Sequence, residues 1–113
     1  MRENSKIEYK REYTADIKKE IIAFANSGGG TIYIGRDNDG KPYPLPDMDE
    51  TLAQITNSIR DGILPDVTMF VGYETDQNGI VITVREGTHK PYFLPEKGIK
   101  PSGVYVRQGT SSV

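Results

Sequence analysis

The sequence contains no cysteine, no tryptophan and a single histidine, His89. Without cysteine, a disulfide framework, a thiol nucleophile and a thiolate-bound metal are excluded. One histidine also excludes a zinc site made of several histidines and gives no basis for a Ser–His–Asp triad. No apolar run approaches the ~18 residues of a membrane span, and the charged N-terminal segment does not have the form of a signal peptide. We therefore expect a cytoplasmic domain with no cofactor and no membrane contact.

The 113 residues are the size of one domain, and their net charge of −2 is unevenly distributed. Residues 1–20 carry a net charge of +1, residues 21–80 a net charge of −6, and residues 81–113 a net charge of +3. The chain as a whole cannot coat nucleic acid through bulk charge. A fold that brought the two ends together could still form a local basic face. The simpler alternative is that the charges are scattered over the surface.

The pattern of apolar residues predicts an α+β fold, a mixed β-sheet with two main helices. One helix begins with Asp16 as N-cap and ends at the glycines 28–30, and the other begins at Asp47, which has capping-box spacing to Glu50. Alternation predicts strands at residues 7–10, 31–35, 67–73 and 80–84, with short extended edge segments at 91–95 and 104–107. We expect residues 1–113 to be a single domain excised from a longer protein. The predicted buried residues are Ile21, Phe24, Ile32, Ile34, Ile55, Ile59, Val71 and Ile82.

Two glycine-rich segments do not fit nucleotide-binding loops. Gly35 to Lys41 has the spacing of a phosphate-binding loop, but Pro42 follows where a helix would have to begin. The glycines 28–30 lie between a predicted helix and a strand, which is the reverse of the dinucleotide-binding order. Both segments are interpreted as turns.

Carboxylates form the first candidate site. Glu3, Glu8 and the acidic turn at Asp37 would meet at one end of the sheet if the first two predicted strands pair. Three converging carboxylates could hold a divalent cation for phosphodiester cleavage. The alternative is that they are solvated or paired with nearby cations of the first strand.

Cations, aromatic residues and hydroxyls form the second candidate site. They occur in the first strand and in the C-terminal third of the chain, where they could contact phosphates and bases. The alternative is an ordinary edge strand with surface cations. The candidate nucleic-acid contacts are Lys10, Arg11, His89, Lys90, Tyr92, Arg107, Thr110 and Ser111.

Four blocks in order along the chain resemble the Schlafen AlbA-type domain, a DNA-binding module of bacterial transcriptional regulators. The blocks are Glu3–Lys10, Lys19–Gly30, Ile32–Gly40, and Lys90–Tyr92 together with Tyr105–Ser112. The resemblance implies an α+β fold and a nucleic-acid-binding domain of a transcriptional regulator, with DNA as the expected ligand and a homodimer as the expected assembly.

The resemblance also implies an alternative function. In the tRNA-cleaving Schlafen branch, two glutamates five residues apart and a later aspartate form a metal-dependent ribonuclease site. Glu3 and Glu8 have this spacing, and the third acid aligns with Asp37 or falls on Asn38. A protein-interaction module is a further alternative.

Overall fold

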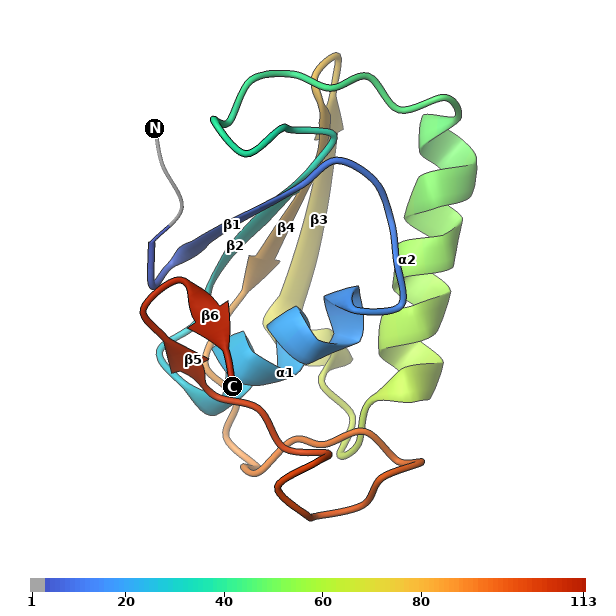
Figure 1. Ribbon diagram of the computed structural model, residues 1–113. Helices are drawn as coiled ribbons and strands as arrows, with labels where there is room; N and C mark the ends of the chain where they lie inside the picture. Colours follow the sequence, from blue (N-terminus) through green and yellow to red (C-terminus); the bar gives the residue numbers. More distant parts are fainter. Residues whose placement is uncertain (1–3) are drawn as a thin grey trace.

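The computed structural model describes residues 4–113 as an α+β fold of two helices and a mixed sheet (Figure 1), which confirms the predicted class. The main strands are β1 (Ile7–Lys10), β2 (Gly30–Ile34), β3 (Val71–Asp76) and β4 (Gly79–Val84). The helices are α1 (Ile17–Asn26), α2 (Met48–Gly62) and the short 3₁₀ helix η1 (Thr68–Phe70). The strands β5 (Arg107–Gln108) and β6 (Ser111–Ser112) form a separate C-terminal hairpin.

The main sheet has the strand order β1-β2-β4-β3. β1 and β2 are parallel and are joined through α1, whereas β4 runs antiparallel to both β2 and β3. The carboxyl ends of β1 and β2 therefore lie at the same end of the sheet, next to the start of β4. The last residue of β4 lies at the opposite end of the sheet, where Val84 pairs with Gly30.

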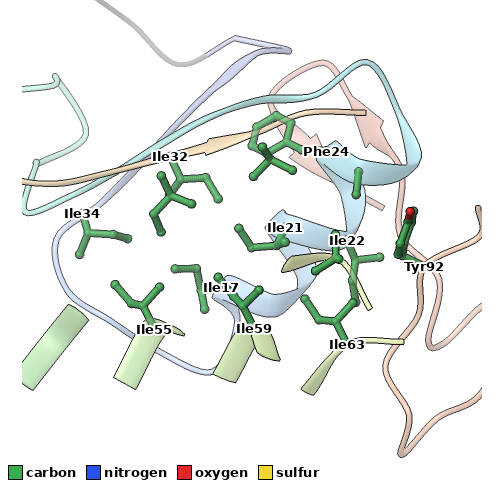
Figure 2. Packing of buried hydrophobic residues seen from close by; sticks show 14 of the residues in the cluster. Ile17, Ile21, Ile22, Phe24, Ile32, Ile34, Ile55, Ile59, Ile63 and Tyr92 are labelled. Carbon is green, nitrogen blue, oxygen red and sulfur yellow. The ribbon is translucent and has the colours of Figure 1, made fainter. Parts of the chain in front are cut away.

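The core lies between the sheet and the two helices. Figure 2 shows side chains of α1 between those of β2 and α2, with Ile21 in the middle and Phe24 against the strands. All the predicted core residues are buried except Val71, which is half-buried because it begins the edge strand β3. The helix phases read from the apolar spacing are thus confirmed.

Of the two N-caps predicted from the sequence, the structure confirms one. Asp47 caps α2, since its Oδ1 accepts a hydrogen bond of 3.0 Å from the N–H of Glu50. The prediction that Asp16 caps α1 is wrong: Asp16 has helical backbone angles, and its side chain makes no cap hydrogen bond. Instead, its carboxylate lies 3.3 Å from the ammonium of Lys19, one turn further on.

Two predicted extended segments differ in the structure. Residues 68–70 form η1 instead of continuing a strand from residue 67, because the Asp66 carboxylate accepts hydrogen bonds from the N–H and the hydroxyl of Thr68. The exposures of Val67 (0%) and Met69 (71%) agree with this turn, since alternate residues of a strand would share a face. Residues 104–107 do not extend the main sheet, because β5 pairs only with β6 among the described strands.

Candidate nucleic-acid interface

Glu8 and Lys10 lie on the helix-covered face of the sheet. In the parallel register of β1 and β2, Glu8 is opposite Ile32 and Lys10 is opposite Ile34, both of which are core residues. Residues opposite one another in register project from the same face of a sheet. The two charged side chains of this edge strand therefore point toward α1, where they need partners of opposite charge.

Arg107 supplies the main partner from the far end of the sequence. Its Nη1 donates hydrogen bonds to Glu8 Oε1 (2.7 Å) and Glu20 Oε2 (3.1 Å), and its Nη2 donates to the backbone carbonyls of Asn4 (2.9 Å) and Ile7 (3.1 Å). The guanidinium carbon also lies 4.9 Å from the centre of the Phe24 ring. Only 2% of the Arg107 side chain is exposed. Its role in the structure is to hold the C-terminal hairpin against β1 and α1.

Lys10 completes this group. Its ammonium lies 3.6 Å from Glu8 Oε2 and 3.6 Å from Glu20 Oε1, and 27% of its side chain remains exposed. Two carboxylates and two cations thus balance one another, which offsets much of the cost of removing them from water. We refer to Glu8, Lys10, Glu20 and Arg107 as the acid–base cluster.

The hairpin of β5 and β6 lies next to the start of β1 and beside α1 (Figure 1). The hydroxyl of Ser112 donates a hydrogen bond to Glu20, the same carboxylate that pairs with Lys10. The turn between the strands uses Gly109 at a φ of 60°, and the neighbouring Thr110 and Ser111 are exposed. Two hydroxyls therefore face solvent close to the acid–base cluster.

A crevice of about 370 Å³ opens at the carboxyl end of β1. The loop after β2 reaches it because the N–H groups of Gly35 (2.8 Å) and Arg36 (3.1 Å) both donate to the carbonyl of Lys10. Ligands of α/β sheets bind outside the carboxyl ends of parallel strands, and small-molecule sites occupy about 300–1,000 Å³. The residues that line the crevice are mostly polar: Glu8, Tyr9, Lys10, Arg11, Glu12, Thr14 and Asn38.

Arg11 and Asp37 lie beside this crevice. The exposed guanidinium of Arg11 is 5.4 Å from the centre of the Tyr43 ring. Asp37 closes its own turn, because its Oδ1 accepts hydrogen bonds from the N–H groups of Lys41 (3.0 Å) and Asp39 (2.9 Å). The hydrogen bond from Lys41 in particular holds the pKa of Asp37 below its ordinary value.

The structure brings together only part of the predicted nucleic-acid contacts. Lys10 and Arg11 lie at the carboxyl end of β1, and the hairpin that carries Thr110 and Ser111 lies against the start of the same strand. His89 and Lys90 follow β4, and the last residue of β4 pairs with the first residue of β2. These two side chains therefore belong to the end of the sheet opposite the carboxyl end of β1, where Lys10 lies. The ammonium of Lys90 pairs with Glu86.

Tyr92 and Arg107 are not available at the surface as the sequence had suggested. Tyr92 is fully buried, its ring packs edge-on against Phe70, and its hydroxyl accepts a hydrogen bond from the N–H of His89. The backbone of Tyr92 is held by Asn26, whose side chain also donates to the carbonyl of Tyr105. Both predicted contacts instead bind the C-terminal segment to the core.

The predicted carboxylate site is only partly described. Glu3 lies outside the described residues, Glu8 pairs with Arg107 and Lys10, and Asp37 bonds within its own turn. Within residues 4–113, no three histidine or acidic side chains are grouped so as to hold a metal ion. The ribonuclease alternative stays a prediction that depends on Glu3.

Glu20 and Asn26 carry roles that the sequence did not suggest. Glu20 lies four residues before Phe24, at the margin of the apolar stripe of α1, and a charge at that margin could have indicated a buried partner. Asn26 follows the stripe directly, and nothing in the sequence marks its contact with residues 92 and 105. Across the described part of the chain, no helix has the length and apolar character needed to cross a bilayer.

Comparison with solved structures finds a similar fold in the N-terminal domain of a RecG-related protein from Nitrosomonas europaea, determined by solution NMR. The TM-score is 0.61 at 23% sequence identity, and the match covers 94% of this chain and 78% of the other. No match was found among curated proteins. A family model described as Schlafen, AlbA_2 matches residues 3–113, and the chain therefore belongs to the Schlafen AlbA_2 family.

Proposed function

We propose that this chain is a nucleic-acid-binding domain of a transcriptional regulator, with DNA as the expected ligand. The solved structure that shares its fold belongs to a protein named for its relation to an ATP-dependent DNA helicase, which fits a role on nucleic acid. The sequence resemblance to the DNA-binding modules of bacterial regulators points the same way.

One observation carries the proposal. Because Arg107 holds the hairpin against Glu8 and Glu20, groups from both ends of the chain lie along the edge strand β1, with Lys10 and Arg11 at its carboxyl end and the hairpin at its start. Lys10 and Arg11 provide positive charge there, and Thr110 and Ser111 provide hydroxyl donors. Cations and hydroxyls are the side chains that commonly contact phosphates. We refer to Lys10, Arg11, Thr110 and Ser111 as the β1 surface.

Arg11→Ala tests this assignment, because Arg11 is exposed and forms no buried ion pair with any residue from 4 to 113. We expect weaker binding of a fluorescently labelled oligonucleotide, measured by anisotropy at several salt concentrations. Loss of one phosphate contact lowers the slope of log affinity against log salt by about 0.7–0.9. Arg60→Ala is the matched control, since Arg60 is an exposed arginine on α2 that pairs with its neighbour Asp61.

An unchanged slope in Arg11→Ala would remove the β1 surface from consideration. If the unsubstituted chain bound neither DNA nor RNA at low salt, the nucleic-acid function would be wrong. The protein-interaction alternative would then lead. Light scattering during the same titrations measures whether the chain forms the homodimer expected from the sequence.

A further inference from the structure

Neither long helix is suited to reading duplex DNA. The residues of α1 from Ile21 to Ala25 are all buried, so this helix cannot enter a groove. The exposed face of α2 carries Asp49, Glu50 and Asp61 but only one cation, Arg60. A helix in the major groove lies between two phosphate backbones, which repel a face with this charge.

The C-terminal hairpin is equally unsuited to a groove. A two-stranded ribbon can enter the major groove when its outward side chains meet the bases and phosphates. Here the one cation of the hairpin, Arg107, points inward and is 2% exposed, while Gln108, Thr110 and Ser111 are neutral. Among the described helices and strands, those that could protrude into a duplex therefore lack the necessary charge.

The crevice at the end of β1 is an open depression, not a protrusion, and its lining is mixed. Lys10 and Arg11 contribute positive charge, while Glu12 and Asn38 contribute acceptor oxygens. Glu12 is exposed and forms no ion pair with any described residue, unlike Glu8, which is neutralised by Arg107 and Lys10. A free carboxylate repels phosphate but accepts hydrogen bonds from the amino groups of bases, as in glutamate recognition of cytosine N4.

We infer that the crevice receives one unpaired nucleotide, with its phosphate on Arg11 and the amino edge of its base on Glu12 and Asn38, so that the domain binds single-stranded nucleic acid in preference to duplex. This inference rests on the proposed nucleic-acid function and names the ligand form of the same site. A base in a duplex is stacked and paired, and it cannot enter a concave site without being extruded. An unpaired base meets no such barrier.

The test compares a single strand of about a dozen nucleotides, within the size range of single-strand sites, with a hairpin duplex of the same composition. We expect anisotropy titrations to show about tenfold tighter binding of the single strand, the discrimination that one good base contact supplies. Oligo(dC), whose bases present an amino group, is expected to bind more tightly than oligo(dT).

Two variants separate base recognition from charge. Glu12→Ala and Asn38→Ala are expected to weaken single-strand binding and to remove the preference for oligo(dC). Glu12→Ala also removes a negative charge, so its duplex affinity stays equal or rises, and the ratio of the two affinities falls toward one. Glu74→Ala is the matched control, because Glu74 is an exposed carboxylate on β3, at the other edge of the sheet.

Duplex binding as tight as single-strand binding by the unsubstituted chain would overturn the inference while leaving the proposed function intact. An unchanged ratio in both Glu12→Ala and Asn38→Ala would overturn it as well. Failure of both nucleic acids to bind would instead overturn the proposed function. Circular dichroism of each variant checks that the fold is retained, which we expect because both side chains are exposed.

Discussion

Arg107 shows how much one residue depends on its surroundings. The sequence predicts Arg107 to be a nucleic-acid contact, because it lies among aromatic residues and hydroxyls. In the structure its guanidinium satisfies two carboxylates and two backbone carbonyls beneath the hairpin. Its effect on nucleic-acid binding is therefore indirect, through the position of the hairpin.

Arg107→Ala is expected to lower the free energy of unfolding by about 3–5 kcal/mol, because it removes the buried guanidinium that pairs with both Glu8 and Glu20. Urea denaturation measures this loss. Arg107→Lys keeps the charge but not the forked donors, and we expect an intermediate loss. Arg60→Ala serves as control and should change stability by less than about 1 kcal/mol, so an equally small effect of Arg107→Ala would contradict the buried role.

Asp37 supplies a prediction about pH. The N–H groups of Lys41 and Asp39 stabilise its ionised form, so its pKa in the folded chain lies below the ordinary value of 3.8. Its contribution to stability is therefore present above that ordinary value and is lost as the pH falls through the lower pKa of the folded state. An NMR titration of the carboxyl carbon measures the pKa. Asp37→Asn keeps an acceptor oxygen and removes the titration, and an ordinary pKa for Asp37 would refute this account of the turn.

At the scale of elements, the junction of α1 and β2 determines how closely the helix packs on the sheet. Gly29 has a φ of 78°, and its N–H donates to the carbonyl of Phe24, which ends the helix. Gly30 then lies directly against the Phe24 ring, since a Cβ there would be 2.4 Å from Cε1 of that ring. The two glycines thus serve different purposes, one for backbone conformation and one for close approach.

Phe24→Ala is expected to cost roughly 3–5 kcal/mol, because the ring is fully buried. Gly30→Ala is expected to destabilise the domain through the clash with the same ring, whereas Gly72→Ala, with no atom within 4 Å of the added Cβ, is the strand control. Urea denaturation of the double variant should show less than the sum of the two losses, since removing the ring also removes the clash. Phe24→Leu replaces Phe24→Ala in this cycle if the latter does not fold. Additive losses would contradict the contact.

The whole molecule is closed by contacts between its two ends. The Glu8–Arg107 pair spans 99 residues of sequence, and the backbone of Arg107 also donates to the hydroxyl of Ser27. The hairpin itself is short, with mutual backbone hydrogen bonds of 2.7 and 2.9 Å between Val106 and Val113. A hairpin of this size is not stable by itself in water, so its order depends on the acid–base cluster.

Glu20→Gln is therefore expected to increase amide hydrogen exchange at Arg107 and Val113 and at the β1 residue Lys10, while β4 keeps its protection. The reason is that Glu20 contacts Arg107, Lys10 and Ser112 together. Exchange measured by NMR or mass spectrometry reports each segment separately. Glu74→Gln, distant on β3, is the control. Faster exchange throughout the chain would indicate general destabilisation instead of a local opening.

The order and type of most elements could be predicted from the sequence, because apolar period and turn residues are local properties. The stripe of α1, the cap of α2 at Asp47 and the alternation in β2 and β4 needed no information about distant residues. The strand predicted at residues 67–73 begins only at Val71, again for a local reason, since the side chain of Asp66 begins a turn that competes with alternation. The four family blocks also lie within continuous stretches of the chain.

The tertiary structure alone decided which charges form a surface and which form a buried cluster. The sequence places Lys10, Arg11, Lys90 and Arg107 in comparable surroundings. The strand register places Lys90 at the end of the sheet opposite the carboxyl end of β1, where Lys10 lies. Arg107 is instead buried against Glu8 and Glu20 by the hairpin. Burial and pairing of a charge depend on residues far away in the sequence, here 87 and 99 positions apart. Local pattern carries no record of such contacts, so the β1 surface and its crevice could be recognised only in the folded chain.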